Sequence, residues 1–292
     1  MMKAMKKSSK RDSGLKPTAR RPVRPTRRKA ARLGQHFLMH ARIAERIALV
    51  ADLSSEDIVV EIGPGTGMLT RELLKQAGRV VAIEADSELV RNLEMKFARE
   101  ISSKRLTLVH ADIRTWPTPG VGQKKYKVVA NIPYYLTGEI LRTFLSAKNQ
   151  PSSMTLLVQK EVAERIVGRK KPYSAKATKG KESILSLSVK AYGEPKYEFT
   201  VPRGAFRPAP NVDSAVLTIR GISRKNFASE ASEKIFFDIL HAAFAHKRKY
   251  VSKNLVESGL LSREQLQKAR IGEKARAEDL RLSSWLQLIA DE

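Results

Sequence analysis

Short apolar runs alternate with amphipathic segments from residue 33 onward, and this alternation restricts the possible folds more than any other feature. The expected strands are residues 58–62, 79–83, 105–110, 127–130 and 154–158. A helix is expected after the first of these strands and ends near residue 76. Further helices are expected over residues 87–98, 138–147 and 161–167. Strands and helices that alternate at this spacing predict an α/β fold with a parallel sheet.

The pattern changes in the last third of the chain. Residues 184–191 and 214–219 are two further strand candidates without a long helix between them, and we expect an antiparallel hairpin at the sheet edge. From about residue 230 the pattern is wholly helical, with helices expected over residues 233–245, 250–258, 263–268 and 283–289. These patterns predict a catalytic domain over residues 33–222 and a small all-helical domain over residues 223–292.

Charge points to a polyanionic partner. The chain has 292 residues with 55 Lys and Arg against 30 Asp and Glu, a net charge of +25, and nucleic acid is the usual partner of such a protein. Residues 1–32 hold 13 Lys or Arg and one Asp, so about half of the excess lies elsewhere. We expect this tail to be disordered and to contact RNA. A solubilising tail and a transit peptide remain alternatives.

Cysteine and hydropathy limit the setting. The absence of cysteine excludes disulfides and thiolate metal sites, and fits a reducing cytoplasm. No apolar run reaches the roughly 20 residues of a membrane-spanning helix. We therefore expect a cytoplasmic protein that is not bound to a membrane.

A glycine-rich turn follows the first expected strand and predicts a nucleoside site. The sequence of residues 61–67 is E-I-G-P-G-T-G, in which Gly63 and Gly65 let the backbone pass close to a ligand. A nicotinamide-type G-x-G-x-x-G pattern would need a third glycine at Met68, so it fails. The E-x-G-x-G-x-G spacing resembles the turn of class I, Rossmann-like methyltransferases.

Carboxylates end the second and third expected strands. Glu84 and Asp86 follow the second strand, where a carboxylate can accept both hydroxyls of a ribose. Asp112 follows the third strand and can accept the amine of a cofactor adenine. Each acid could instead cap a helix. Their convergence at the carboxyl ends of neighbouring strands favours a cofactor site for S-adenosylmethionine.

The fourth expected strand ends in N-I-P-Y, residues 131–134, which suits transfer to an adenine amine. The side-chain oxygen of Asn131 and a backbone carbonyl, that of Ile132, can accept hydrogen bonds from both amine hydrogens and steer the nitrogen lone pair. Pro133 stiffens the loop, and Tyr134 offers a ring on which an extruded base can stack. No metal or nucleophilic side chain is required. The alternative is a simple turn with a core tyrosine.

Together with several further stretches, these motifs resemble those of a known family, the KsgA family of small-subunit ribosomal RNA adenine dimethyltransferases. The resemblance covers residues 34–292 and is carried by residues 34–38 (GQHFL), 61–67, 131–134, 159–161 (QKE), 206–214 (FRPAPNVDS) and 244–255. Two positions depart from the family, which usually has Asn in place of His36 and Tyr-Gly in place of residues 182–183. Residues 169–181 form a basic stretch that we interpret as an RNA-facing loop.

The resemblance implies an activity and its site. It implies that the chain is a monomer that transfers four methyl groups to two adjacent adenines near the 3′ end of 16S ribosomal RNA, inside an assembling small subunit. It also implies that Phe206 is a second stacking partner of the target base. The implied cofactor contacts are His36, Leu38, Gly63, Glu84, Asp112 and Asn131.

Three other functions remain to be separated. A resistance-type methyltransferase of large-subunit RNA shares the same core, although residues 206–214 and the helical tail favour the small subunit. A non-catalytic assembly factor is disfavoured by the intact Asn131, Pro133 and Tyr134. A nicotinamide oxidoreductase is disfavoured by the glycine spacing.

Overall fold

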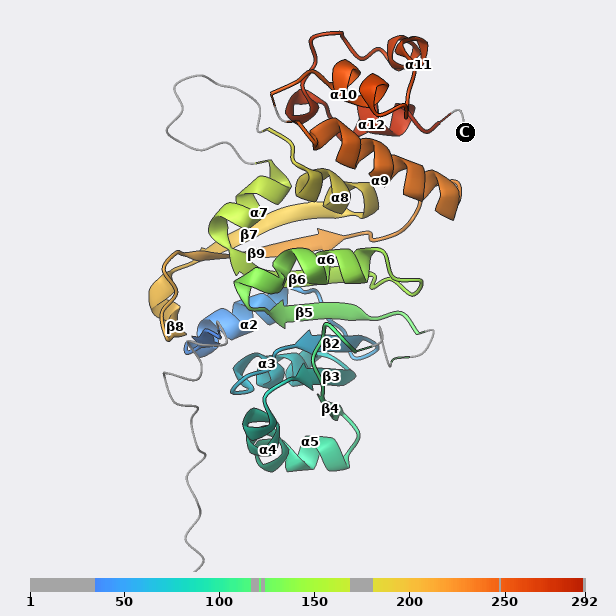
Figure 1. The fold of residues 1–292 in the computed structure, drawn as a ribbon. Helices are drawn as coiled ribbons and strands as arrows, with labels where there is room; N and C mark the ends of the chain where they lie inside the picture. Colours follow the sequence, from blue (N-terminus) through green and yellow to red (C-terminus); the bar gives the residue numbers. More distant parts are fainter. Residues whose placement is uncertain (1–34, 117–120, 122–123, 169–180, 247, 291–292) are drawn as a thin grey trace, which may run out of the picture.

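The computed structural model describes residues 35–116, 121, 124–168, 181–246 and 248–290. The expected basic tail and residues 169–180 of the expected RNA-facing loop lie outside the described residues. Within them, the centre of the molecule is one sheet of seven strands in the order β4-β3-β2-β5-β6-β9-β7 (Figure 1). The strands are β2 (Ile58–Ile62), β3 (Arg79–Glu84), β4 (Leu106–His110), β5 (Lys127–Asn131), β6 (Ser153–Gln159), β7 (Glu194–Val201) and β9 (Ser214–Arg220).

The pairing of these strands confirms the predicted α/β architecture. Strands β4, β3, β2, β5 and β6 run parallel, whereas β9 pairs antiparallel with both β6 and β7. Strand β2 has β3 on one side and β5 on the other, so the chain changes direction across the sheet at β2. Open α/β sheets form their ligand crevice at the carboxyl ends of the strands beside such a switch point.

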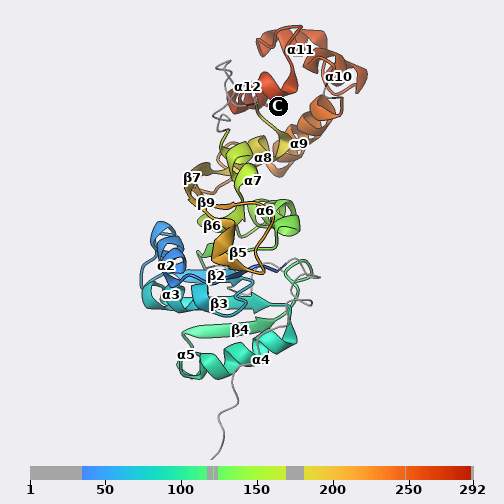
Figure 2. The same cartoon turned by 90° about the vertical axis from the view of Figure 1, so that its left-hand side faces the viewer.

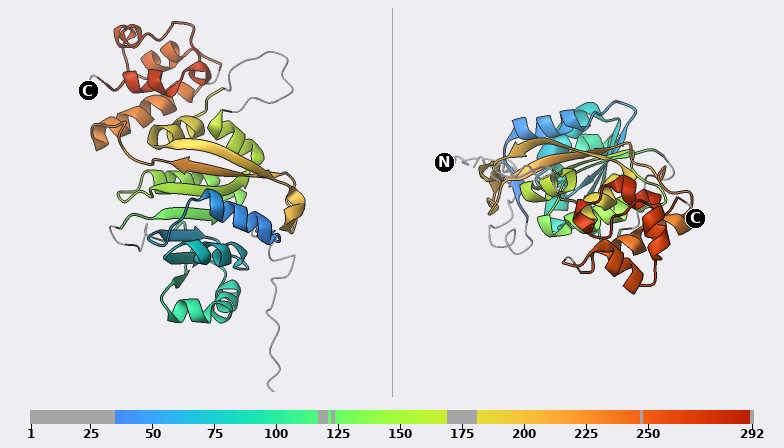
Figure 3. Two further views of the ribbon diagram at one scale, coloured as in Figure 1. Left: turned by 180° about the vertical axis from the view of Figure 1, so that it is seen from behind. Right: turned by 90° about the horizontal axis from the view of Figure 1, so that it is seen from above.

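Helices cover both faces of the sheet (Figures 2 and 3). Neighbouring strand residues alternate between the faces, so that Val59 packs with helices α2 (Ala41–Val50), α3 (Met68–Gln76) and α4 (Ser87–Lys96). Val60 packs on the opposite face with helices α6 (Thr137–Leu145), α7 (Lys160–Val167) and α8 (Ile184–Tyr192). Because strands buried on both faces must be apolar throughout, their continuous apolar runs were visible in the sequence.

One expected strand is wrong, since residues 184–191 form helix α8. Ser183 begins this helix with a capping box, in which its hydroxyl accepts from the Ser186 N–H at 3.1 Å. Glu182 adds two side-chain bonds, accepting from the Ser186 hydroxyl and from Lys190, both at 2.6 Å. The helix is packed by α6, α7, α9, α12 and β7, so it lacks the continuous polar stripe by which a surface helix is recognised.

The strand that completes the expected antiparallel edge is β7, which the pattern did not indicate. It pairs only with β9 and carries Pro195, Lys196 and Glu198. Proline and charged side chains are tolerated at a sheet edge, where they prevent pairing with another chain. These same residues make the strand hard to recognise from its sequence.

A second, two-stranded sheet lies beside the carboxyl end of the main one. Strand β1 (Phe37–Leu38) pairs antiparallel with β8 (Phe206–Arg207), and the Met39 N–H donates to the Ala205 carbonyl at 2.9 Å. This pair joins the start of the described chain to residues 206–214. Two stretches far apart in the sequence therefore meet at the ligand crevice.

The last helices form an all-helical part beyond β7 (Figure 1), as the sequence predicted. They are α9 (Glu230–Phe244), α10 (Val251–Glu257), α11 (Arg263–Lys268) and α12 (Leu282–Gln287). Aromatic rings connect this part to the catalytic part, with Tyr192 stacked on Phe237 at 5.9 Å and Phe227 edge-on to Phe236 at 5.4 Å. One hydrophobic cluster consequently runs from the sheet into these helices. Among the described residues, no helix is long and apolar enough to cross a membrane.

Candidate cofactor and substrate site

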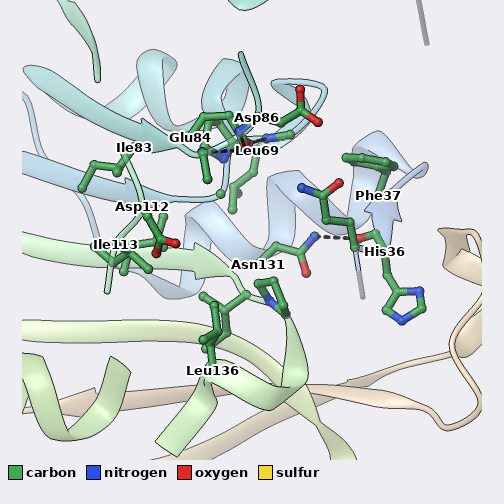
Figure 4. Close-up of a pocket in the computed structure, with 18 of the residues that line it drawn as sticks. His36, Phe37, Leu69, Ile83, Glu84, Asp86, Asp112, Ile113, Asn131 and Leu136 are labelled. Carbon is green, nitrogen blue, oxygen red and sulfur yellow. Dashed lines mark hydrogen bonds between the residues drawn. The ribbon is translucent and has the colours of Figure 1, made fainter. Parts of the chain in front are cut away.

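A cavity of 390 Å³ opens at the carboxyl ends of β2, β3 and β5, next to β1 (Figure 4). Its walls also include the segment after β4 and the turn η1 (Tyr134–Leu136). The structure brings all but one of the predicted site residues to this cavity: His36, Leu38, Gly63, Gly65, Glu84, Asp112, Asn131, Ile132, Pro133 and Tyr134. The exception is Phe206.

The glycine turn gives the cavity a wall of bare backbone. Gly63 and Gly65 have positive φ angles of 69° and 57°, which side chains rarely allow. A Cβ on Gly65 would lie 3.0 Å from the ring of Phe37, and one on Gly63 would lie 3.5 Å from the Asn131 carbonyl oxygen. The turn is thus packed between β1 and the end of β5.

Glu84 is the last residue of β3 and lines the cavity. It is only 4% exposed, and both carboxylate oxygens accept backbone N–H bonds. Oε2 accepts from Gly65 at 3.1 Å, and Oε1 accepts from Ala85 at 2.9 Å and from Asp86 at 3.0 Å. Burial raises the pKa of Glu84 above its usual value. The Asp86 carboxylate instead caps helix α4, accepting from the N–H of Glu88 at 2.8 Å.

Asp112 lies on the more open side of the cavity and is held by Arg114. The side chains are 35% and 51% exposed, respectively. Arg114 Nε lies 3.1 Å from both carboxylate oxygens, and its Nη2 donates to Oδ2 at 2.6 Å. These hydrogen bonds lower the pKa of Asp112. Asp112 Oδ1 also accepts from the backbone N–H of Arg114 at 2.9 Å, so the carboxylate caps the turn that follows it, although no helix begins there in the described chain.

The amide of Asn131 is oriented by the residue that precedes β1. Its Nδ2 donates to the backbone carbonyl of His36 at 3.1 Å (Figure 4). This bond fixes which end of the amide faces His36 and leaves the side-chain oxygen as an acceptor for a ligand in the cavity. The segment that leads into β1 therefore sets the orientation of the residue on which the predicted chemistry depends.

Tyr134 is fixed from two sides. Its hydroxyl shares a hydrogen bond of 2.7 Å with the Ser214 hydroxyl, and its ring centroid lies 5.5 Å from that of His36. The His36 ring in turn contacts the carbonyl of Pro208 through Nδ1 at 2.8 Å. Burial raises the pKa of Tyr134. These contacts hold the ring in the wall of the cavity that also contains Asn131.

The expectation for Phe206 is not met in this structure. Its side chain is 2% exposed and belongs to the hydrophobic cluster on the α2 and α3 face, with Leu38 and Val201. In the β1–β8 pair Phe206 lies opposite Leu38, which lines the cavity, but the Phe206 ring packs in the core cluster and is not part of the lining. The sequence motif located Phe206 beside the site but did not reveal the side to which the ring points.

Glu61, the first residue of the glycine motif, lies behind the turn and does not line the cavity. It is buried, and within the described chain neither carboxylate oxygen has a hydrogen-bond partner. Burial raises the pKa of Glu61 to about 8. The carboxyl is therefore mostly protonated at neutral pH, which avoids an unpaired charge behind the turn.

Sequence reasoning missed several residues that shape the site. Phe37 covers Gly65, Arg114 pairs with Asp112, and Ser214 holds Tyr134. Lys96 reaches from α4 to the Thr66 carbonyl at 2.6 Å and so holds the glycine turn from outside. Phe37 and Ser214 lie inside the motifs already singled out, whereas nothing in the sequence pointed to Arg114 or Lys96.

The chemistry of the cavity suits S-adenosylmethionine. Glu84 and Asp112 offer acceptors for the hydroxyls and the amine of a nucleoside, and the glycine backbone leaves room beside them. Arg114 is the only Lys or Arg in its lining as described, and Asp112 already neutralises it. Glu84 and Asp86 leave the lining net negative, which favours a cationic sulfonium.

Comparison with known proteins identifies the family. Residues 26–291 match the family model for ribosomal RNA adenine dimethylase. The chain belongs to the ribosomal RNA adenine dimethylase family. It is therefore a methyltransferase that uses S-adenosylmethionine, as predicted.

Relatives and solved structures agree with this membership. The chain is 41% identical to a ribosomal RNA small subunit methyltransferase A of Dehalococcoides mccartyi, covering 88% of this chain and 86% of the relative. For the protein of the same name from Fusobacterium nucleatum the identity is 37%, covering 88% and 94%. A dimethyladenosine transferase from Plasmodium falciparum has a TM-score of 0.71 at 25% identity, covering 87% and 96%. The 23S rRNA methyltransferase ErmE has a TM-score of 0.69 at 27% identity, covering 87% and 98%.

Proposed function

We propose that the chain dimethylates the N6 amines of two adjacent adenines near the 3′ end of 16S ribosomal RNA, within an assembling small ribosomal subunit. It acts in the cytoplasm as a monomer. The observation that carries the proposal is the oriented Asn131 amide, which lies beside the fixed ring of Tyr134 and in the same cavity as Glu84. The greater identity to the small-subunit enzymes than to ErmE favours the small subunit over the large one.

The cofactor is held by residues at three strand ends. Glu84 accepts hydrogen bonds from the ribose hydroxyls, and Asp112 accepts one from the adenine amine. Arg114 keeps the Asp112 carboxylate charged. Gly63, Gly65, His36 and Leu38 provide the surrounding wall. When bound, S-adenosylmethionine supplies an electrophilic methyl group on its sulfonium.

The chain's own contribution to the reaction is to grip the target amine. An adenine amine is a poor nucleophile because its lone pair is delocalised into the ring. The Asn131 side-chain oxygen and the Ile132 carbonyl accept hydrogen bonds from its two N–H groups, which holds the nitrogen lone pair toward the methyl group. When the nitrogen takes the methyl group from the sulfonium, it releases one of these protons to water. Pro133 keeps the two acceptors in a fixed relation, and Tyr134 stacks on the extruded base. Catalysis in this scheme is positioning and electrostatics.

The variant Asn131→Ala tests the grip. We expect methyl transfer to fall at least about 100-fold, the usual loss for a polar group that acts in a transition state. Binding of the RNA should remain nearly unchanged, since the phosphate contacts lie elsewhere. A variant that methylates at the parental rate would contradict the assignment of Asn131.

Mass mapping of modified adenines tests the substrate. The protein is incubated with unmethylated small subunits and, separately, with large subunits. We expect two dimethylated adenines in 16S RNA, whereas transfer to 23S RNA alone would establish the rival activity. S-Adenosylhomocysteine should raise the melting temperature and NAD should not, which separates the oxidoreductase alternative. Sedimentation of the free protein tests the monomer.

The proposal extends to the basic tail, residues 1–32. Its deletion should weaken RNA affinity and flatten the dependence of affinity on salt, because fewer phosphates are neutralised. An unchanged salt slope would show that the tail does not contact phosphates. The boundary between residues 222 and 223, with a helical RNA-contacting domain after it, is likewise part of the proposal.

A further inference from the structure

Tyr135 stands apart from the other residues of the cavity wall. It is 65% exposed, whereas its neighbour Leu136 is buried. Among the described residues, its side chain makes no hydrogen bond and no ring contact. An exposed aromatic side chain is unremarkable on most surfaces, but this one lines the mouth of the substrate cavity.

Two successive tyrosines here point in different directions. Tyr134 and Tyr135 both belong to η1, a 3₁₀ turn in which consecutive side chains diverge by about 120°. The Tyr134 hydroxyl is tied down to Ser214, and its ring forms part of the cavity. The Tyr135 ring therefore projects from the same turn toward the outside, one residue away from the place proposed for the extruded adenine.

Arg114 supplies a cation at the same mouth. Its Nε and Nη2 hold Asp112, which leaves the two N–H groups of Nη1 available, because a guanidinium has five donors. Arg114 and Tyr135 both line the cavity, and each is more than half exposed there. Aromatic rings together with arginines are the groups by which proteins hold single-stranded nucleic acid.

We propose that Tyr135 and Arg114 form a second nucleotide site at the mouth of the catalytic cavity, in which Tyr135 stacks on the base next to the target adenine and Arg114 contacts a phosphate. The site rests on the function proposed above and adds the position of the neighbouring nucleotide. It holds the strand next to the extruded base, so extrusion does not depend on Tyr134 alone. The chemistry is sequence-tolerant, since every base has a face on which a tyrosine can stack.

A different occupant would be the adenine of the cofactor, because Asp112 and Arg114 line the same side of the cavity. The high exposure of the ring disfavours it, since a side chain folded over the cavity would be partly covered. The two occupants predict different losses, so the test below separates them.

The test uses the full-length protein with unmethylated small subunits, in the variants Tyr135→Ala and Tyr135→Phe. Met95→Ala is the matched control, because Met95 is 70% exposed on α4 and does not line the cavity. We expect Tyr135→Ala to raise the KM for subunits about tenfold, the usual loss of one base stack. Its affinity for S-adenosylhomocysteine and its melting temperature should not change. Tyr135→Phe, which keeps the ring, and Met95→Ala should match the parent.

Arg114→Gln gives an independent measurement, the affinity for subunits as a function of salt in the absence of cofactor. Loss of one phosphate contact should reduce the slope of log Kd against log salt by about 0.7–0.9, whereas Tyr135→Ala should leave the slope unchanged. An unchanged slope for Arg114→Gln would overturn the phosphate contact.

Three outcomes decide the proposal. A KM within twofold of the parent for Tyr135→Ala rejects the stacking site while leaving the proposed function intact. Weaker binding of S-adenosylhomocysteine with an unchanged KM assigns the ring to the cofactor instead. If the parental protein itself transfers no methyl group to small subunits, the proposed function fails, and the second site fails with it.

Discussion

Glu84 and Asp112 follow neighbouring strands and line one cavity, but their surroundings differ in burial and in partners. Glu84 is buried and takes three backbone N–H bonds, so its position is set by the sheet and the glycine turn. Asp112 is partly exposed, and a flexible, exposed Arg114 side chain holds its carboxylate. A carboxylate bound by backbone is organised before the ligand arrives, whereas one bound by a surface side chain can rotate with it.

Because of this difference, we expect the two ends of the cofactor pocket to contribute unequally to cofactor binding. The buried end provides hydrogen bonds that water does not screen, at the cost of desolvating a carboxylate. The open end has little desolvation to overcome and contributes correspondingly less. We therefore expect cofactor affinity to depend mainly on Glu84, with Asp112 adjusting it.

Glu84→Gln should have the largest effect. The amide nitrogen of glutamine cannot accept a hydrogen bond, so at least one of the backbone N–H groups of Gly65, Ala85 and Asp86 would lose its acceptor. The ribose hydroxyls would also lose a charged partner. We expect S-adenosylhomocysteine to bind about 10- to 100-fold more weakly, a loss of about 1.5–3 kcal/mol. Calorimetric titration measures it, and a loss below threefold would contradict the ranking of the two acids.

Gly65→Ala disturbs the same end through the backbone. The residue has φ 57° and its new Cβ would lie 3.0 Å from the Phe37 ring, so we expect a stability loss of about 1–2 kcal/mol. The Gly65 N–H would move away from Glu84, and affinity should fall about tenfold. Gly138→Ala is the matched control, because nothing lies within 4 Å of its Cβ, in helix α6. It should leave affinity unchanged and stability equal or slightly higher.

The Gly138→Ala control decides whether the effects of Gly65→Ala come from the glycine turn. If Gly138→Ala lowered the melting temperature as much as Gly65→Ala, the loss could not be attributed to the turn. If Gly65→Ala retained full affinity, the packing of Phe37 on the turn would be irrelevant to the cofactor.

The two carboxylates also differ in the direction of their pKa shifts. Burial raises the pKa of Glu84, whereas the hydrogen bonds from Arg114 lower that of Asp112. As pH falls, Glu84 therefore takes up a proton above the usual range of a glutamate, and cofactor affinity should fall several-fold before the pH reaches that range. The effect on folding has the opposite sign, because a raised carboxyl pKa contributes stability below its unfolded value that is lost as pH rises through the folded pKa. The cofactor affinity of Asp112→Asn should show the same pH dependence as that of the parent, whereas the cofactor affinity of Glu84→Gln should not change over the same range.

The comparison also shows what a sequence can reveal about such a site. Glu84 and Asn131 were found because strand ends in a parallel sheet converge on one crevice, so that position along the chain gives position in space. The pairing of Asp112 with Arg114 was not predicted from the sequence, because the partner of an exposed side chain depends on local geometry that no sequence pattern records. Phe206 was placed near the site for the right reason, but the sequence did not show that its ring is buried in the core cluster with Leu38; its stacking role stays a prediction.

The errors in the fold have a similar origin. Apolar and polar residues alternate over 184–191, as in a strand, but the two serines in that pattern do not form a polar face. Ser186 is buried and bonded to Ser183 and Glu182 within the helix start. Only the tertiary packing of α8 by helices on several sides explains the pattern.

Asp112→Asn should have the smallest effect and tests the open end directly. Asparagine keeps an oxygen that can accept a hydrogen bond from the adenine amine, and the ion pair that is lost is exposed and therefore weak. We expect binding of S-adenosylhomocysteine to weaken by about fivefold at most, with an unchanged melting temperature. Because an exposed pair is screened by salt, the difference between variant and parent should shrink as salt is raised, whereas the loss in Glu84→Gln should persist. Equal salt sensitivity of the two variants would mean that burial does not distinguish the two ends of the pocket.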